Sequence, residues 1–192
     1  MCADPARHLS ELQHRVTVAW RNYEVWWIYK GQHTRPKFIE AMNQYSLFFE
    51  TSIHAHFVAL LMALYQMYET RPDTFNIPSL LSELESNDKF DAATVAKLKM
   101  MHDAAKPVWV KVSILRNKAF GHRSMHTTTE KAFKEAGLTP NDLRSLIEQT
   151  RDLLNIASYV WDRSDLPFDL SAGEDLTRLL TDISRQSGSS NT

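Results

Sequence analysis

Apolar residues recur at steps of three, four and seven along nearly the whole chain, and this helical period constrains the fold more than any other feature. Residues 5–30, 36–69 and 140–161 each carry such a stripe. The first consists of Leu9, Leu12, Val16, Trp20, Tyr23 and Trp27. Only 5 glycines and 7 prolines interrupt the 192 residues, which argues against a turn-rich β architecture. The sequence therefore predicts an all-α protein.

Capping and helix-breaking residues divide this pattern into separate helices. Asp4 and Pro5 are typical of a helix start, and so are Thr139 and Pro140. Gly31 begins a connection, and Pro167 is expected to end the last long helix. The predicted helices span residues 5–30, 36–69, 79–85, 90–106, a further segment from 107 to 120, 128–136 and 140–166.

Four long amphipathic helices with short excursions predict an up-and-down four-helix bundle. The length of 192 residues fits one domain, which we expect over residues 1–165. Residues 166–192 then form an appendage, with a short amphipathic helix over 174–185 and a disordered tail over 186–192. The stripes of the first two helices are broad and aromatic, which favours a homodimer, although composition alone also fits a monomer.

Composition and charge exclude several classes of protein. The formal net charge is −1, so any contact with nucleic acid must rest on a local patch of cations. Cys2 is the single cysteine, which excludes an internal disulfide and a multi-cysteine zinc site. The longest apolar run, residues 57–65, is too short to span a bilayer, and the first residues form no signal peptide. We expect a soluble, cytoplasmic protein without a membrane partner.

One local patch of cations follows the segment that begins at Pro107. Residues 104–129 contain no Asp or Glu, whereas the same stretch carries the cationic residues Lys106, Lys111, Arg116, Lys118 and Arg123. His122 and His126 add two groups that can take up a proton near neutral pH. This combination favours a phosphodiester substrate and predicts RNA contacts by Lys111, Lys118, Arg123 and His126.

The residue types in this patch match the requirements of RNA cleavage. Imidazole suits proton transfer at neutral pH, so His122 is the candidate acid/base residue. The planar guanidinium of Arg116 matches phosphate oxygens, and Asn117 can orient the phosphate. Gly121 can end the helix, which would let His122 turn back toward Arg116. This chemistry needs no metal or other cofactor, and no carboxylate cluster stands nearby in the sequence.

The stretch Leu115-Arg116-Asn117-Lys118-Ala119-Phe120-Gly121-His122-Arg123 resembles the arginine-x(4–6)-histidine motif of the HEPN superfamily, in the branch associated with bacterial abortive infection. That resemblance implies a helical bundle, often dimeric, with the motif near the dimer interface. It also implies a metal-independent endoribonuclease of a defence or toxin–antitoxin system, with Arg116, Asn117 and His122 as catalytic residues. A nucleotidyltransferase-like antitoxin is an implied partner.

Other interpretations of these residues stay open. Arg7 and His14 match the same spacing, but they lie among surface residues at the start of the first helix. Cations at a helix C-terminus also complement the helix dipole without any ligand. A non-catalytic HEPN-type module that binds RNA, nucleotide or a partner is the main alternative, and a plain helical interaction protein is the second.

Two further histidines, His54 and His56, form a His-x-His pair that does not predict a metal site. Two steps along a helix place them about 200° apart, so they cannot readily share an ion. His56 falls close to the apolar stripe of its helix, which favours a hydrogen-bonded core histidine.

Overall fold

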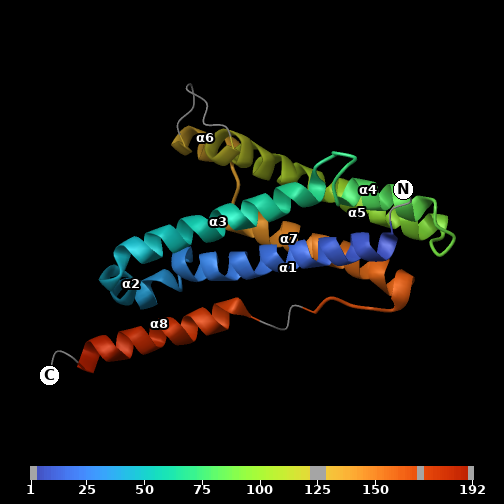
Figure 1. Cartoon of the computed structure of the whole chain (residues 1–192). Helices are drawn as coiled ribbons and strands as arrows, with labels where there is room; N and C mark the ends of the chain where they lie inside the picture. Colours follow the sequence, from blue (N-terminus) through green and yellow to red (C-terminus); the bar gives the residue numbers. More distant parts are fainter. Residues whose placement is uncertain (1–3, 122–128, 168–170, 190–192) are drawn as a thin grey trace.

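The computed structural model describes residues 4–121, 129–167 and 171–189, and within these ranges the chain is helical without a strand (Figure 1). The all-α prediction is confirmed. Its elements are α1 (Pro5–Lys30), α2 (Arg35–Gln44), α3 (Ser46–Tyr68), α4 (Ile77–Glu85), α5 (Ala92–Leu115), the π-helical turn η1 (Arg116–Gly121), α6 (Thr129–Ala136), α7 (Pro140–Asp162) and α8 (Ala172–Ser189).

Helices α1, α3, α5 and α7 form the predicted up-and-down bundle, with alternating directions along the chain (Figure 1). The short helix α4 lies at one end of the bundle, and η1 and α6 lie toward the other. Helix α8 runs beside α1 on the side of the bundle away from α6. Each long helix turns its apolar stripe inward, and together they enclose one continuous core.

Polar caps set the starts of the helices where the sequence predicts them. The Asp4 side chain accepts a hydrogen bond from the backbone N–H of Ala6 at 3.1 Å. Thr139 and Asp142 form a reciprocal capping box at the start of α7. The prediction that Pro167 ends α7 is wrong, because Arg163 adopts a left-handed conformation with φ of 65° and closes the helix earlier.

The predicted single helix over residues 36–69 is wrong, because the chain breaks at Tyr45 into α2 and α3. Tyr45 has φ of −127° and ψ of 46°, outside the helical region, and its side chain is exposed. The two parts bury different surfaces, since α2 packs against α8 whereas α3 packs along α1. A straight helix could not make both contacts, so the break follows from packing rather than from a breaker residue.

The predicted boundary at Pro107 is also wrong, because α5 continues without a break from Ala92 to Leu115. Proline lacks the N–H that would bond the carbonyl of Asp103, one turn earlier. Both residues are exposed, so water can take that place. The helix therefore tolerates the proline and carries its apolar stripe past it to Val112 and Leu115, both fully buried.

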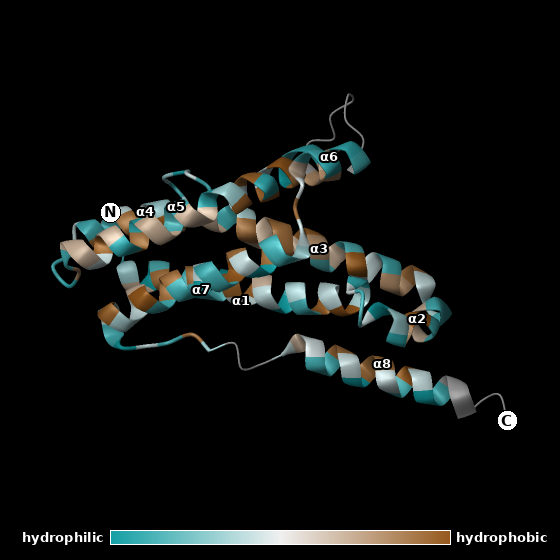
Figure 2. Ribbon diagram, turned by 180° about the vertical axis from the view of Figure 1, so that it is seen from behind, coloured by the Kyte–Doolittle hydropathy of each residue, from teal (hydrophilic) through white to brown (hydrophobic). Residues whose placement is uncertain are grey.

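Helix α8 adds a second, smaller apolar cluster to one side of α1. Leu176 and Leu180 pack against Tyr29, Met42 and Phe49. The helix extends beyond the predicted 174–185 to Ser189, and residues 190–192 of the expected tail lie outside the described residues. The hydropathy of α8 alternates around its axis, with a brown apolar stripe and a teal polar one (Figure 2).

Helix α3 is the one described helix that is long and apolar enough to cross a membrane by length and composition. It also forms the most extensive helix pair of the bundle, with α1, and its Leu60, Leu61, Leu64 and Met67 lie in the core. A core helix of a helical bundle has this same length and composition.

Candidate functional site

The candidate site begins where α5 passes into the π-helical turn η1, which contains Arg116 and Asn117. A π-helical turn is rare and is frequently found at functional sites. Here it follows directly on Leu115, a fully buried core residue, so the start of the turn is anchored to the bundle. The sequence predicted a helix up to Gly121, and the helical backbone extends that far, although in the wider π form.

The Arg116 guanidinium is held from two sides. Its Nη1 donates a hydrogen bond to Oδ1 of Asn117 at 2.8 Å, and its Cζ lies 4.5 Å from the centre of the Tyr65 ring. Its Nε is buried and has no hydrogen-bond partner among the described residues. A cation–π contact orients a guanidinium without consuming its N–H donors, so the bond to Asn117 is the one hydrogen bond that they donate within the described part of the chain.

Asn117 connects this arginine to α5. Its Nδ2 donates to Oγ of Ser113 at 3.3 Å while its Oδ1 accepts from Arg116. The side chain is exposed, which leaves it accessible beside the guanidinium. The structure therefore brings together Arg116 and Asn117, two of the predicted site residues, through a hydrogen bond.

The two lysines predicted to contact RNA have carboxylate partners from outside the acid-free stretch. Lys111 Nζ lies 3.0 Å from Oδ2 of Asp142 at the start of α7, and Lys118 pairs with Glu135 of α6. Burial raises the pKa of Asp142, but hydrogen bonds from Thr139 and Lys111 outweigh it, so the net pKa is lowered. The expected excess of positive charge is therefore smaller than the sequence suggests.

Among the described residues, Arg116 is the one cation between positions 107 and 121 that has no carboxylate partner within ion-pair distance. The other three predicted site residues, His122, Arg123 and His126, lie outside the described residues. Their proposed roles stay predictions.

The second match to the spacing, Arg7 and His14, forms no comparable arrangement. The Arg7 guanidinium lies 5.3 Å from the centre of the Phe75 ring, and His14 is exposed. The neighbouring His8 is buried instead, with Nδ1 at 3.0 Å from Glu83 and Nε2 against the backbone of Asn76. These contacts tie α1 to α4 and serve the fold.

A comparison with protein families places the chain as a whole rather than single residues. The family model for HEPN proteins described as AbiU2 matches residues 4–179, most of the chain. This chain belongs to the AbiU2 family of HEPN proteins. No curated protein and no solved structure matches it. The predicted HEPN resemblance to the abortive-infection branch is therefore confirmed, and the match extends past the four-helix bundle into α8.

A cavity that the sequence did not predict lies beside η1 in this AbiU2-family chain. It has a volume of about 570 Å³ and is lined by Trp26, Lys30, Glu50, Ile53, His54, Phe57, Ala119, Phe120 and Phe133. The His54 ring lies 5.8 Å from that of Phe120, one turn beyond Arg116 along η1. His54 is exposed on α3, so only the tertiary arrangement brings it to the motif.

His56, in contrast, has the structural role that its position predicted. Its Nδ1 lies 2.8 Å from Oδ1 of Asn22, a contact between α3 and α1, and burial lowers the pKa of His56. The two histidines of the pair thus face different surroundings. In the described part of the chain, no three His, Cys, Asp or Glu side chains converge as metal ligands would.

Proposed function

We propose that this HEPN protein is a metal-independent endoribonuclease of a bacterial defence or toxin–antitoxin system. The observation that carries the proposal is Arg116, whose guanidinium is oriented by Tyr65 and Asn117 but lacks a carboxylate partner among the described residues. A half-buried cation in that state gains most from an anion that brings oxygen acceptors, such as a phosphodiester. Membership of the AbiU2 family supports the same conclusion.

In the proposed reaction, a ribose 2′-oxygen attacks the adjacent phosphorus, the P–O5′ bond breaks, and a 2′,3′-cyclic phosphate forms. His122 accepts the proton of the 2′-hydroxyl and returns one to the leaving 5′-oxygen. Arg116 stabilises the charge that develops on the phosphate oxygens, and Asn117, which bonds the Arg116 guanidinium, orients the phosphate. Every proton in this scheme is moved by the protein, so no metal step is needed.

Lys111, Lys118, Arg123 and His126 are the proposed RNA contacts around this centre. Lys111 and Lys118 are ion-paired with Asp142 and Glu135, so each would exchange a carboxylate for a phosphate when RNA binds. Both pairs are partly exposed, and exposed pairs contribute little free energy, so this exchange costs little.

A homodimer is part of the proposal, with the two motifs contributing to one composite site. Three large apolar side chains are exposed at the α2–α3 junction, those of Tyr45, Leu47 and Phe48. They support association with another polypeptide chain. A nucleotidyltransferase-like antitoxin is the proposed partner in a toxin–antitoxin version, and the cytoplasm is the proposed location. Light scattering of the purified protein measures the oligomeric state directly.

A non-catalytic HEPN module that binds RNA, nucleotide or a protein partner is the second candidate. The ion pairs at Lys111 and Lys118 favour it, because they reduce the positive charge available for pulling RNA into a cleavage site. This candidate predicts binding that weakens with salt and yields no cleavage products.

The deciding experiment incubates the purified protein with RNA in EDTA and follows 2′,3′-cyclic phosphate ends. We expect His122→Ala to reduce the rate by roughly 10²–10⁴-fold and Arg116→Ala by roughly 10²–10³-fold. Arg7→Ala and His14→Ala are matched controls, because they remove the same residue types from the other match to the motif. Equal rates for all five proteins would exclude the assignment, and RNA binding without products would favour the second candidate.

A further inference from the structure

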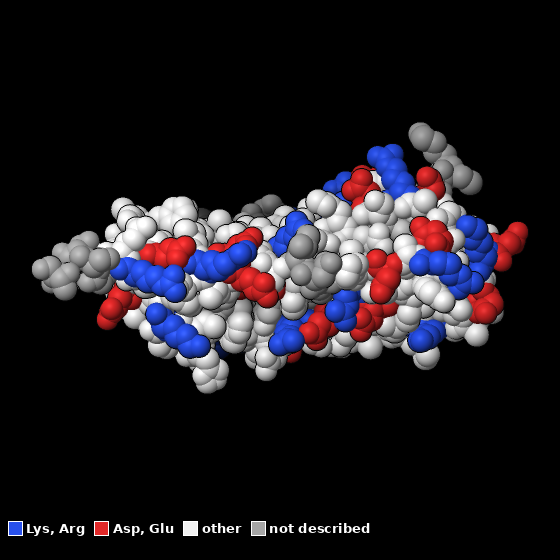
Figure 3. Space-filling view, turned by 90° about the horizontal axis from the view of Figure 1, so that it is seen from below, with Lys and Arg blue, Asp and Glu red and all other residues white. Residues whose placement is uncertain are grey.

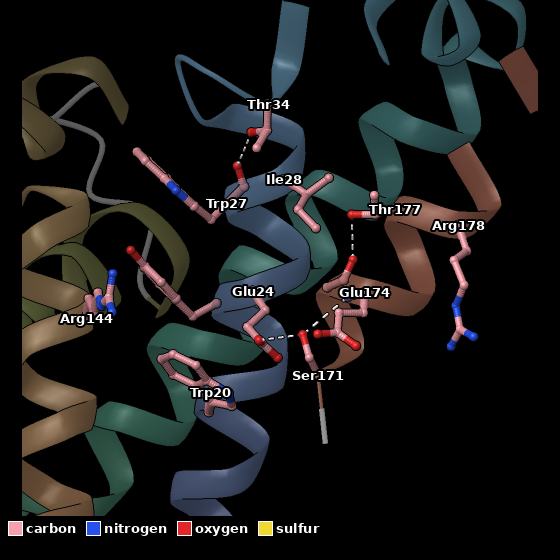
Figure 4. A pocket seen from close by; sticks show the side chains of 12 residues that line it. Trp20, Glu24, Trp27, Ile28, Thr34, Arg144, Ser171, Glu174, Thr177 and Arg178 are labelled. Carbon is pink, nitrogen blue, oxygen red and sulfur yellow. Dashed lines mark hydrogen bonds between the residues drawn. The ribbon is translucent and has the colours of Figure 1, made fainter. Parts of the chain in front are cut away.

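A second cavity, with a volume of about 670 Å³, is lined by residues of α1, α7 and the start of α8 (Figure 4). Aromatic residues of α1 line one side, namely Trp20, Tyr23 and Trp27. The start of α8 lines the other, with Ser171, Gly173 and Glu174. A cavity of this size and largely apolar lining suits a small organic ligand.

The aromatic side of this cavity is a row of nearly parallel rings. Tyr23 stacks on Trp20 at 6.1 Å between ring centres and on Trp27 at 6.3 Å. The electron-rich faces of such rings attract cations, most strongly when water is partly excluded. Tyr23 is buried, whereas both tryptophans are half-exposed and accessible to a ligand.

Glu24 contributes a carboxylate that is only partly satisfied. Its Oε1 accepts a hydrogen bond from Oγ of Ser171 at 2.7 Å, and Figure 4 shows this bond joining α1 to the start of α8. Its Oε2 is buried and has no hydrogen-bond partner among the described residues. Leaving a buried charged acceptor without a donor is costly, so a ligand N–H that reaches Oε2 would be favoured.

The charges around the cavity determine whether it favours a cationic or an anionic ligand. Its two guanidinium groups already have carboxylate partners: Arg144 Nε lies 2.8 Å from Oε1 of Glu148, and Arg178 pairs with Asp175. Glu24 and Glu174 have no ion pair among the described residues, so the lining retains an excess of negative charge. Figure 3 views the molecule from the α8 side and shows mixed charges rather than a basic field.

From these contacts we infer that the cavity binds a small organic ammonium ion with an apolar body. The N–H groups of the ammonium donate to Glu24, its charge is balanced by Glu24 and Glu174, and the body packs on Trp20 and Trp27. A phosphate-bearing ligand is disfavoured, because Glu24 and Glu174 have no ion pair among the described residues and would repel it. This inference does not depend on the proposed ribonuclease activity.

Binding is tested with three probes that share a phenyl ring: benzylamine as the cation, benzyl alcohol as the neutral analogue and benzoate as the anion. The chain has five tryptophans, so the indole N–H signals in a nitrogen-15 NMR spectrum report the position of the probe. We expect millimolar benzylamine to shift the signals of Trp20 and Trp27 and to leave Trp109, which does not line the cavity, unchanged. Benzyl alcohol and benzoate should each bind at least about tenfold more weakly.

Two variants locate the recognition. Glu24→Gln keeps an acceptor for Ser171 but removes the charge, so the affinity for benzylamine should fall about tenfold. Glu174→Gln lies at an exposed position and should fold normally, with a smaller loss in the same direction. Glu40→Gln is the matched control, because it removes an exposed carboxylate that does not line the cavity. Binding unaffected by Glu24→Gln, binding of benzoate equal to that of benzylamine, or no shift of either tryptophan signal would each overturn the inference.

Discussion

The N-terminal end of α1 and the turn η1 each contain the arginine of a match to the HEPN spacing, Arg7 and Arg116, but the polar groups around these two arginines differ in their partners. At the start of α1, neighbouring polar side chains form hydrogen bonds with other parts of the protein. His8 is 1% exposed and bonds Glu83 and Asn76, and the Arg15 guanidinium donates to the carbonyl of Phe75. Together these contacts hold α1 against α4 and against the loop that precedes α4.

At η1 the contacts orient the polar groups but leave part of their hydrogen-bonding capacity without a partner among the described residues. Arg116 keeps a buried Nε without a partner among the described residues, and its charge is not matched by a carboxylate there. Buried polar groups without partners reduce stability, and such departures are expected mainly at functional or strained sites. The comparison teaches that the spacing of a motif is less informative than the partners of the polar groups around it.

The largest difference between the two regions is expected at His8. His8→Ala removes partners from a backbone N–H and a carboxylate in a buried place, so the free energy of unfolding should fall by about 3 kcal/mol. His14→Ala, at an exposed position of the same helix, should change it by less than about 0.5 kcal/mol. Urea denaturation measures both, and equal losses would show that His8 has no structural role.

The pH dependence of stability separates structural histidines from solvated ones. Burial lowers the pKa of His102, which stacks on Tyr68, and nearby Lys106 lowers it further against the effect of Asp103. The folded state therefore binds a proton less readily than the unfolded state. The stability that neutral His102 contributes is complete above the ordinary histidine pKa of about 6.5. It is lost as the pH falls from there through the lowered pKa of His102 in the folded state.

His102→Phe should therefore flatten the decline in unfolding free energy between about pH 7.5 and 5. Buried His56 has the same direction of shift, so His102→Phe should remove only part of the slope. An unchanged slope in His102→Phe would show that the proton is bound elsewhere.

Arg116→Met should have a smaller effect on stability than the loss of His8. The substitution removes a cation–π contact and retains much of the apolar stem, so unfolding free energy should change by less than about 1 kcal/mol. Arg15→Met, which leaves the Phe75 carbonyl without its donor, should cost more, at about 1–2 kcal/mol. Thermal unfolding of both variants decides this, and the reverse order would contradict the contrast between the regions.

The smallest expected effect on stability is at Lys118. Lys118→Gln breaks a partly exposed ion pair with Glu135, so it should change unfolding free energy by less than about 1 kcal/mol. If Lys118 exchanges Glu135 for an RNA phosphate, the same substitution should lower the salt dependence of RNA binding by about one phosphate contact. An unchanged salt slope would remove Lys118 from the proposed RNA contacts.

Local signals predicted most of the helices, and they failed where packing decided. Asp4 and Thr139 mark helix starts because each side chain bonds a backbone N–H two or three residues away. Tyr45 has no such local signal, and the break there depends on α2 reaching α8. Pro107 has a strong local signal, but its exposed side allows water to replace the missing bond.

In the candidate site, too, contacts between chain neighbours were predictable and contacts between helices were not. Arg116 and Asn117 are neighbours in the chain, so their pairing was predictable. The contact of Arg116 with Tyr65, the position of His54 beside Phe120 and the partners of the two lysines were not, because each joins different helices.

The sequence by itself determined the helical composition, the apolar stripes that enclose one core, and the resemblance to the HEPN family. These depend on interactions within a few residues and on the helical period. Only the tertiary structure decided which charges are neutralised and which cavities form. Lys118 and Glu135 are 17 residues apart, and Glu24 and Ser171 are 147 apart. Such contacts depend on how the helices pack, which no local pattern specifies.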